Sequence, residues 1–367
     1  MQYREFGSTG IKLSALGWGL MRLPQNDDEA VEVIRYGIEK GINYLDTAPG
    51  YNDGWSEQML GNAIQGYDRS KLYLSTKNPL QCDTREGWRQ RLETSLERMQ
   101  CDYIDFYQVG HGLSWEAYED NFSKAGIHEC RKATDEGLVR NWCLSCHDNP
   151  DNMIKLLDTG IFKGMTLQYN LLDRNNEKVI EFAKDNGLGI IVMGPVGGGR
   201  LGFASEQISS MLPAEQATTP EVAIRFVLGN PGVTVALSGM NSKAMVDENV
   251  ATASREESLS TDELQAIEKA LSENKELSKL YCTGCNYCMP CPNNVGIPEN
   301  FSLMNMHKVW GLTDHAKGGY KHLGLDHRKG LLPASECIEC GECEDKCPQN
   351  IPIIEQLKET AKALGDD

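Results

Sequence analysis

Short hydrophobic runs recur along the first two thirds of the chain and alternate with longer amphipathic segments. In the longer segments apolar residues recur with the period of a helix, at residues 28–40, 84–99, 152–157, 177–186 and 220–228. The short runs predict a hairpin from residues 3–6 and 11–13, then eight strands at residues 13–18, 42–46, 72–76, 103–108, 141–145, 165–169, 189–193 and 233–237. Alternating strands and helices give parallel strands with helical crossovers, and eight of them close a barrel. The sequence therefore predicts an α/β fold, a (β/α)₈ TIM barrel.

The last third of the chain has a different pattern. A charged amphipathic helix is predicted at residues 261–280, and further helical patterns occur at residues 300–309 and 353–364, without alternating strands between them. We therefore expect a barrel at residues 1–258, a bridging helix at 259–280 and a mostly helical domain at 281–367. The length of 367 residues agrees, because a barrel of this kind takes about 250 residues.

Composition narrows the class of protein further. The chain has 36 basic and 53 acidic residues, and no basic run that could neutralise a phosphate backbone, which argues against nucleic acid as a partner. No 18 apolar residues run together and the N-terminus lacks the apolar core of a signal peptide, which argues against membrane insertion and secretion. We expect a cytoplasmic protein, in which clustered cysteines are more often metal ligands than disulfides.

Four polar residues follow consecutive predicted strands. Asp46 ends one strand and Tyr51 lies on the loop after it, Lys77 ends the next strand, and His111 follows the third. The carboxyl ends of barrel strands meet at one face, where barrel enzymes hold their active sites. Each residue alone has an ordinary structural explanation: Asp46 as a helix cap, Lys77 as its ion-pair partner, and His111 as a satisfied loop residue. Their order and spacing together indicate one active site.

These four residues resemble the catalytic tetrad of the aldo-keto reductases. The likeness extends from LGWGLMRLP near residue 20 to SGMNSKAMVDENV near residue 249. It implies NAD(P)-linked reduction of an aldehyde or ketone, or oxidation of the alcohol, with Tyr51 as general acid. A phenol with the ordinary pKa of about 10 is a weak acid at neutral pH, and a neighbouring ammonium lowers that pKa. The resemblance assigns this role to Lys77, balanced by Asp46, with His111 orienting the carbonyl oxygen.

The histidine departs from the family pattern by one residue. The family has D-x-Y-x-x-H, whereas DFYQV at residues 105–109 leads to Gly110, and His111 comes next. Side chains alternate along a strand, so an uncompensated shift would turn His111 away from the site. Either Gly110 forms a bulge that restores the direction of the imidazole, or the histidine's role has moved to another residue.

The resemblance also implies residues that hold a nicotinamide nucleotide. Ser145 is similar to the serine that binds the carboxamide, Tyr169 to the residue that stacks on the ring, and residues 193–200 to the glycine-rich loop around the pyrophosphate. Thr166 stands where the family has a carboxamide-binding glutamine. The full implied set is Leu20, Met21, Asp46, Ser145, Cys146, Thr166, Tyr169, Gly194, Val196, Gly198, Arg200, Gly239, Asn241, Glu248 and Asn249.

The sequence leaves NAD and NADP open. Many NADP-preferring members of the family carry a lysine and an arginine at the positions of Gly239 and Met245, where a 2′-phosphate needs cations. Lys243 or another residue could take their place in this chain. Cofactor preference is therefore a matter for the structure and for experiment.

Cys143 and Cys146 form a C-x-x-C pattern within one predicted strand. Their odd separation points the two thiols to opposite faces of the strand, which disfavours a redox-active dithiol. We expect Cys143 in the core and Cys146 in the lining of the pocket.

Eight of the thirteen cysteines form two quartets near the C-terminus. Their spacings, C-x₂-C-x₂-C-x₂-C-P and C-x₂-C-x₂-C-x₃-C-P, are of the ferredoxin type, in which the fourth cysteine of each quartet ligates the other cluster. Zinc is the alternative, because two C-x₂-C pairs suffice for a zinc site. The spacing predicts two [4Fe–4S] clusters, one held by Cys282, Cys285, Cys288 and Cys347, the other by Cys337, Cys340, Cys343 and Cys291.

The two halves handle electrons differently. A nicotinamide transfers two electrons as hydride and each cluster transfers one, so a flavin or a radical-tolerant substrate normally links them. A flavin has no support in the sequence. Similar cysteine-rich modules occur in a branch of the aldo-keto reductases found largely in anaerobes.

Two functional hypotheses follow. The first is a reductase of a small carbonyl compound, or a dehydrogenase of the alcohol, whose clusters are structural, sensory or an electron path to a redox partner protein. The second is an electron-transfer or redox-sensing protein whose barrel mainly binds nucleotide, with vestigial carbonyl reduction. The sequence leaves the substrate, the reaction direction and the oligomeric state open.

Overall fold

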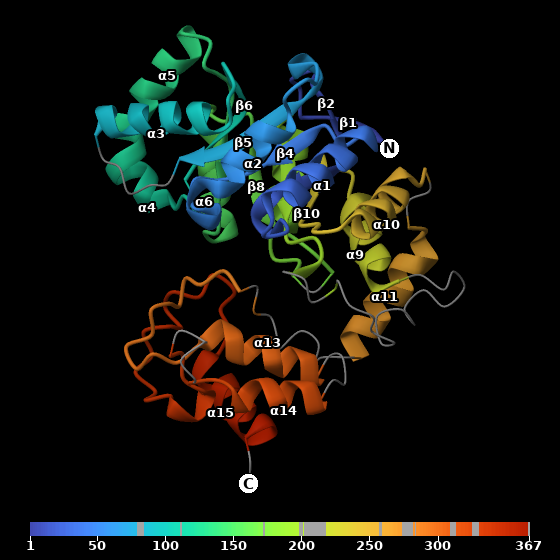
Figure 1. Ribbon diagram of the computed structural model, residues 1–367, viewed down its shortest axis with the longest axis vertical. Coiled ribbons are helices and arrows are strands. Elements are labelled where there is room, and N and C mark those ends of the chain that lie inside the picture. The colour runs from blue at the N-terminus through green and yellow to red at the C-terminus, as the bar shows by residue number, and fades with distance from the viewer. Residues whose placement is uncertain are drawn as a thin grey trace. The chain divides into compact units, whose positions relative to one another are not determined.

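The chain forms two compact units (Figure 1). The first unit comprises residues 1–195 and 223–259, and the second comprises residues 196–222 and 260–367. The computed structural model describes residues 1–78, 84–110, 112–171, 173–197, 201, 218–256, 259–273, 282, 284–308, 313–324 and 330–365.

The first unit is a closed barrel of eight parallel strands, preceded by a hairpin of β1 (Tyr3–Glu5) and β2 (Lys12–Ser14). The strand order is β10-β3-β4-β5-β6-β7-β8-β9, so consecutive strands are neighbours and the last pairs with the first. The predicted (β/α)₈ fold is confirmed, and each of the eight predicted runs contains a strand. They are β3 (Leu16–Gly19), β4 (Tyr44–Asp46), β5 (Tyr73–Asn78), β6 (Ile104–Val109), β7 (Val139–Ser145), β8 (Gly164–Gln168), β9 (Gly189–Met193) and β10 (Val235–Ser238).

Helices lie between the barrel strands in the chain and surround them in Figure 1. The hydrophobic pattern predicts α1, α3, α6, α7 and α9, whereas it misses α2 and α10, whose apolar residues form no clear stripe. Asn26 and Ser242 cap α1 and α10 by accepting hydrogen bonds from first-turn amides. The helices are α1 (Asp27–Glu39), α2 (Trp55–Ala63), α3 (Arg85–Arg98), α4 (Trp115–Ala117), the π-helical η4 (Tyr118–Gly126), α5 (Ile127–Asp135), α6 (Pro150–Asp158), α7 (Glu177–Asp185), α9 (Thr219–Gly229) and α10 (Lys243–Ser254).

Three short 3₁₀ helices precede barrel elements: η1 (Leu20–Arg22), η2 (Tyr51–Gly54) and η3 (Arg69–Lys71). η1 follows β3 directly, and η2 connects the loop after β4 to α2. Both therefore begin at the carboxyl ends of strands, on the face of the barrel where chemistry is expected.

Apolar side chains fill the barrel interior on the side of the hairpin. Phe6 packs edge to face on Phe106 with the ring centroids 4.9 Å apart. A Cβ on Gly189 would lie 2.3 Å from the Phe6 ring, so only glycine lets the hairpin pack this closely. The cluster comprises Phe6, Leu13, Tyr44, Phe106, Cys143, Ile191, Val235 and Leu237.

The second unit is mostly helical in its described part. Its helices are α11 (Thr261–Glu273), α13 (Ile297–Lys308), α14 (Thr313–Lys321), the 3₁₀ helix η7 (Ala334–Glu336) and α15 (Ile353–Leu364). Asn300 is fully buried, and its side chain bonds Gly296 O at 2.7 Å and Ala334 N at 2.8 Å. These bonds tie α13 to the segments that carry the two cysteine quartets, as expected for a helical dicluster domain.

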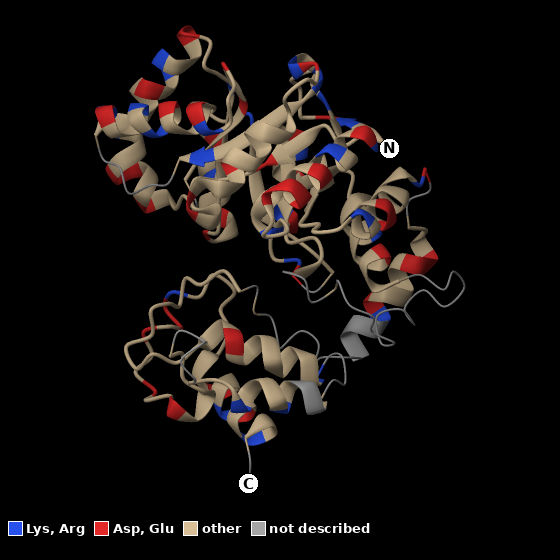
Figure 2. Ribbon diagram, in the orientation of Figure 1, with Lys and Arg blue, Asp and Glu red and all other residues tan. Residues whose placement is uncertain are grey.

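Figure 2 shows acidic residues interspersed with basic ones on the helices of both units, in keeping with the net charge of −17. Within the described ranges, no helix combines the length and the apolar character that crossing a membrane requires.

Candidate functional site

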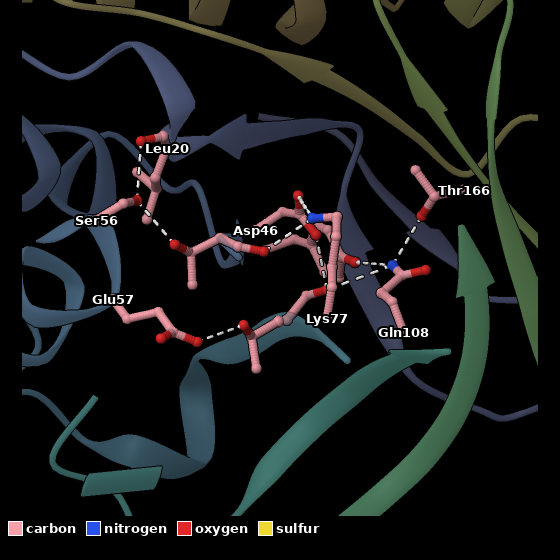
Figure 3. A network of polar contacts seen from close by, with 11 residues as sticks. Leu20, Asp46, Ser56, Glu57, Lys77, Gln108 and Thr166 are labelled. Carbon is pink, nitrogen blue, oxygen red and sulfur yellow. Dashed lines mark hydrogen bonds and ion pairs between the residues drawn. The ribbon is translucent and has the colours of Figure 1, made fainter. Parts of the chain in front are cut away.

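The barrel places a buried ion pair at the carboxyl ends of β4 and β5. Lys77 Nζ lies 2.5 Å from Asp46 Oδ2 and donates to Thr47 O at 2.8 Å, while the Ser75 hydroxyl donates to Asp46 Oδ1 at 2.8 Å (Figure 3). Asp46 and Lys77 are only 2% and 3% exposed. Burial alone would lower the pKa of Lys77, but the charges of Asp46 and Tyr51 and its bonds to them outweigh this and raise that pKa. Lys77 therefore stays an ammonium.

Tyr51 begins η2, and Lys77 Nζ lies 5.0 Å from the centroid of its ring. Burial raises the pKa of the Tyr51 phenol, the charge of Lys77 opposes that rise, and the charge of Asp46 adds to it. The net pKa is above the ordinary value of 10.0. Lys77 therefore lowers the pKa of Tyr51 as expected, but desolvation of the phenol outweighs the ammonium.

The turn after Tyr51 has an unusual backbone. Asn52, Asp53 and Gly54 have φ values of +49°, +55° and +87°, so three consecutive residues adopt the left-handed conformation. Asparagine, aspartate and glycine are the residues that tolerate it best. This turn leads directly into α2 and sets the position from which Tyr51 projects.

Gly110 ends β6 and turns the chain. The pairing of β5 with β6 runs without a bulge from Ser75 opposite Phe106 to Asn78 opposite Val109, and Gly110 follows with a φ of +78°. The ladder is therefore regular up to Val109, and both explanations for the shifted histidine stay predictions. His111 itself lies outside the described residues.

Several predicted nucleotide contacts lie at the carboxyl ends of strands. Leu20 begins η1 after β3, Ser145 ends β7, and Gly239 follows β10. Asn249 on α10 donates to the Ser238 hydroxyl at 3.0 Å, which ties this helix to the end of β10. Met21 is half exposed, Asn241 and Glu248 are exposed, and Gly194 has a left-handed φ of +64°.

Arg22 brings a cation to Gly239, the position where many NADP-preferring relatives carry a lysine. A Cβ on Gly239 would lie 3.4 Å from Arg22 Cδ, so the arginine stem lies against the glycine. The sequence did not single out Arg22, because residues 22 and 239 are far apart in the chain and meet only when the barrel closes.

Three of the predicted nucleotide contacts make hydrogen bonds within the protein. The Cys146 thiol is fully buried and donates to Leu113 O at 2.8 Å, so it does not line an open pocket. Burial raises the pKa of that thiol to about 12. The Thr166 hydroxyl accepts from Gln108 Nε2 at 2.7 Å. Tyr169 bonds Glu177 at 3.1 Å with its hydroxyl and packs its ring on that of Phe226.

Gln108 is a polar residue of the interior that the sequence reasoning missed. It is fully buried, and its Nε2 also lies 3.4 Å from the Tyr44 and Ser75 hydroxyls (Figure 3). Its Oε1 is buried without a hydrogen-bond partner among the described residues. Strand alternation could have predicted its position. Phe106 points into the barrel, and Gln108, two residues further along the same strand, points to the same side.

The glycine-rich loop is described only in part. Val196 O accepts a hydrogen bond from Leu201 N at 3.0 Å, and Val196 is half buried. Gly198 and Arg200 lie outside the described residues, so their predicted role at the pyrophosphate stays a prediction.

Cysteines of both quartets line one cavity in the second unit. Four thiols, from Cys282, Cys285, Cys288 and Cys347, line this cavity together with apolar side chains such as Ile297 and Phe301. This is the crossed set that the spacing predicts for one cluster. No group of three or more histidine, cysteine or acidic residues in the described part converges on a site for a single ion.

The second set also crosses between the quartets. Burial, Glu344 and the neighbouring thiols of Cys337 and Cys291 raise the pKa of the Cys343 thiol to about 11. Cys291 therefore lies near the second quartet, although it belongs to the first in sequence. Cys285 and Cys340 are exposed.

Comparison with known proteins divides the chain into two parts, with the boundary just before the first cysteine quartet. The model of the aldo/keto reductase family matches residues 15–272, and that of a 4Fe-4S dicluster domain matches residues 281–351.

Two curated relatives and one solved structure cover the barrel. L-galactose dehydrogenase of Arabidopsis thaliana is 28% identical over 76% of this chain and 97% of its own length. NADH-specific methylglyoxal reductase of Escherichia coli is 25% identical over 68% and 93%. The holo form of aldo-keto reductase AKR11C1 from Bacillus halodurans is similar with a TM-score of 0.65 and 27% identity, over 74% of this chain and 96% of that structure.

Proposed function

Because this chain belongs to the aldo/keto reductase family and carries a 4Fe-4S dicluster domain, we propose that it is an NAD(P)-linked oxidoreductase of a small carbonyl compound or its alcohol. The observation that carries the proposal is the fully hydrogen-bonded Lys77–Asp46 pair, buried beside Tyr51 at the carboxyl ends of the strands. A buried ammonium next to a phenol is the arrangement that carbonyl reduction needs, because a proton must reach the oxygen as the hydride reaches the carbon.

The nicotinamide ring supplies or accepts the hydride when the nucleotide is bound. Tyr51 donates its hydroxyl proton to the carbonyl oxygen in reduction, and its raised pKa keeps that proton in place at neutral pH before the reaction. Lys77 stabilises the phenolate that remains, because its ammonium lies over the ring. Asp46 holds Lys77 in this position, and Thr47 O fixes a second bond of the same ammonium.

We propose that Leu20, Ser145, Gly239 and Asn249 contact the nucleotide, since all lie at or beside the carboxyl ends of strands. Arg22 is the proposed cation for a nucleotide phosphate, because its stem packs on Gly239. The affinity for NADPH and NADH in wild type and Arg22→Ala tests this. A selective loss of NADPH affinity in the variant supports a 2′-phosphate contact, and equal losses place Arg22 at a phosphate that both nucleotides share.

We propose two [4Fe–4S] clusters held by the crossed cysteine sets, which supply one-electron transfer when bound. The four thiols on one cavity and the proximity of Cys291 to Cys343 support this ligand assignment. A reducing cytoplasm with little oxygen would keep such clusters intact. Iron and sulfide analysis of the anaerobically purified protein should give about eight of each.

Replacing Tyr51 by Phe tests the proposed reaction. General acid catalysis contributes about 10²- to 10⁴-fold to such a rate, so kcat for reduction of a simple aldehyde should fall by that factor. Nucleotide affinity and iron content should not change, because the hydroxyl contacts neither in the proposal. Turnover at the wild-type rate in the variant would exclude Tyr51 as the acid.

One set of observations favours the second hypothesis, an electron-transfer or redox-sensing protein. The Cys146 thiol and the Thr166 and Tyr169 hydroxyls make hydrogen bonds to protein groups, which leaves fewer polar groups for a nicotinamide. In that case wild type and Tyr51→Phe would both bind nucleotide without reducing aldehydes, and the clusters would still accept electrons from an external donor.

A further inference from the structure

We propose that Glu57 is a positioning residue. It fixes the turn that carries Tyr51 relative to the strand that carries Lys77. The inference rests on the proposed function, because it concerns how the proton donor and its ammonium partner keep their geometry. Glu57 lies in the first turn of α2 and its side chain is fully buried.

Glu57 reaches β5 beside Lys77. The Thr76 hydroxyl donates to Glu57 Oε1 at 2.7 Å, and Thr76 is itself fully buried (Figure 3). Thr76 and Lys77 are consecutive on the strand, so their side chains point to opposite faces. Lys77 faces the barrel interior, and Thr76 faces the helix. The bond therefore fixes the strand that carries Lys77 from the outer side.

Glu57 also reaches the turn that carries Tyr51, through Arg98. The Arg98 guanidinium donates to Glu57 Oε2 at 3.2 Å. A Cβ on Gly54 would lie only 2.3 Å from Arg98 Nη1, so the guanidinium lies directly against the backbone of the turn. Arg98 thus contacts both the carboxylate and the last of three left-handed residues after Tyr51. We call Thr76, Glu57, Arg98 and Gly54 the Glu57 link.

The residue before Glu57 makes a parallel connection. The Ser56 hydroxyl donates to Leu20 O at 2.9 Å and lies 2.8 Å from the Thr47 hydroxyl, and all three groups are buried (Figure 3). Thr47 O is also an acceptor for Lys77. The first turn of α2 therefore bonds the ends of β4 and β5 and the start of η1, which together surround the reacting groups.

Stability alone explains Glu57 poorly. A buried ion pair costs desolvation that hydrophobic packing of the same volume avoids, so such pairs are weak evidence for a stabilising role. Here the carboxylate connects two segments whose relative position decides the distance between Tyr51 and Lys77. A displacement of about 1 Å between reacting groups can reduce a rate by about 10²-fold. The Glu57 link is built to prevent such a displacement.

Glu57→Gln is the main test. The amide keeps the shape and the acceptor for Thr76 but removes the charge that faces Arg98. We expect kcat for aldehyde reduction to fall by about 10-fold or more, with nucleotide affinity unchanged. The kinetic isotope effect with deuterated NADH or NADPH should rise, because the chemical step becomes slower. The pH at which reduction is lost should also change, since the influence of Lys77 on Tyr51 depends on their distance.

Thr76 supplies a conservative pair of variants that remains informative if Glu57→Gln folds poorly. Thr76→Ser retains the hydroxyl and should keep the wild-type kcat and pH profile. Thr76→Val has nearly the same shape without the hydroxyl and should lose as much kcat as Glu57→Gln. The double variant should lose little more than either single variant, because both interrupt one link.

Asp105→Asn is the matched control. Asp105 is also a buried strand-linked carboxylate paired with an arginine, Arg69 at 2.6 Å, but it lies at the amino end of β6. It should lower the melting temperature without changing the isotope effect or the pH profile. If Glu57→Gln and Thr76→Val behave in the same way, Glu57 is a structural residue and the inference is overturned. Failure of the proposed function is separate, because it would appear as full turnover in Tyr51→Phe or as no turnover in the wild type.

Discussion

The barrel mouth and the cysteine cavity hold their functional groups by different means. At the mouth, Asp46 and Lys77 lie on rigid strands, are almost fully buried, and have their hydrogen bonds supplied by the protein. In the cysteine unit the ligands lie outside the helices, and Cys285 and Cys340 are exposed. The barrel fold therefore holds the side chains of its site in place by itself. The cysteine ligands, in contrast, should need the bound clusters to hold them in place. Loss of the clusters should therefore disorder the cysteine unit and leave the barrel unchanged.

Removal of the clusters should have the largest effect, and this effect should be confined to the cysteine unit. Chelation of iron, or Cys288→Ser, should unfold most of the region from residue 281 onward, because metal binding supplies folding free energy where the protein core is small. Hydrogen exchange should then be fast in α13 and α15 and unchanged in the barrel strands. Protection of α13 and α15 in the iron-free protein would contradict the comparison.

Lys77→Met should damage the barrel site without touching the cysteine unit. The change leaves the carboxylate of Asp46 buried and unpaired, which costs about 3–5 kcal/mol of unfolding free energy. It should also lower kcat by about 10²-fold or more. Adding Asp46→Asn should restore part of the stability and none of the activity, as measured by thermal denaturation and aldehyde reduction. Recovery of activity in the double variant would show that Lys77 acts only as a partner for Asp46.

The pH dependence should separate the two reaction directions. Reduction needs the protonated phenol, so its rate should persist through neutral pH and fall only as the pH approaches the raised pKa of Tyr51. Alcohol oxidation needs the phenolate, so its rate should be low at neutral pH and increase towards the same pKa. Initial rates in both directions between pH 6 and pH 10.5 would measure this. A fall in reduction below pH 8 would contradict the assignment of Tyr51.

Cys146→Ala should have the smallest effect. The thiol is buried and bonds Leu113 O, so its loss costs about 1 kcal/mol of stability from an unsatisfied carbonyl. Nucleotide affinity should be unchanged, because Cys146 faces the protein interior. Titration calorimetry with NADH and NADPH tests this. A tenfold loss of affinity in the folded variant would show that Cys146 contacts the nucleotide.

The sequence predicts the parts of this molecule whose signals are local. Each strand is a short apolar run, and the cysteine spacing identifies the two quartets because three ligands of one cluster follow each other at fixed intervals. Asp46 and Lys77 could be predicted because they end such runs. These signals depend on neighbours in the chain and not on tertiary packing.

The sequence predicts less where a side chain's direction depends on distant partners. Tyr169 continues past the end of β8 and turns to Glu177 and Phe226, which strand alternation alone does not specify. Glu57 and Arg22 acquire their contacts only when the barrel closes. Burial of the Tyr51 phenol, which raises its pKa against the influence of Lys77, also cannot be predicted from spacing.

The transfer of a label tests the central claim most directly. The iron-loaded protein, kept anaerobic, is mixed with an aldehyde and with NADH or NADPH that carries deuterium at the reactive carbon. If the barrel performs direct hydride transfer, the alcohol product carries one deuterium on its former carbonyl carbon, and the visible absorption of the clusters stays unchanged during turnover. Alcohol without deuterium, formed while the clusters bleach, would contradict the account and place the electron path through the cysteine unit.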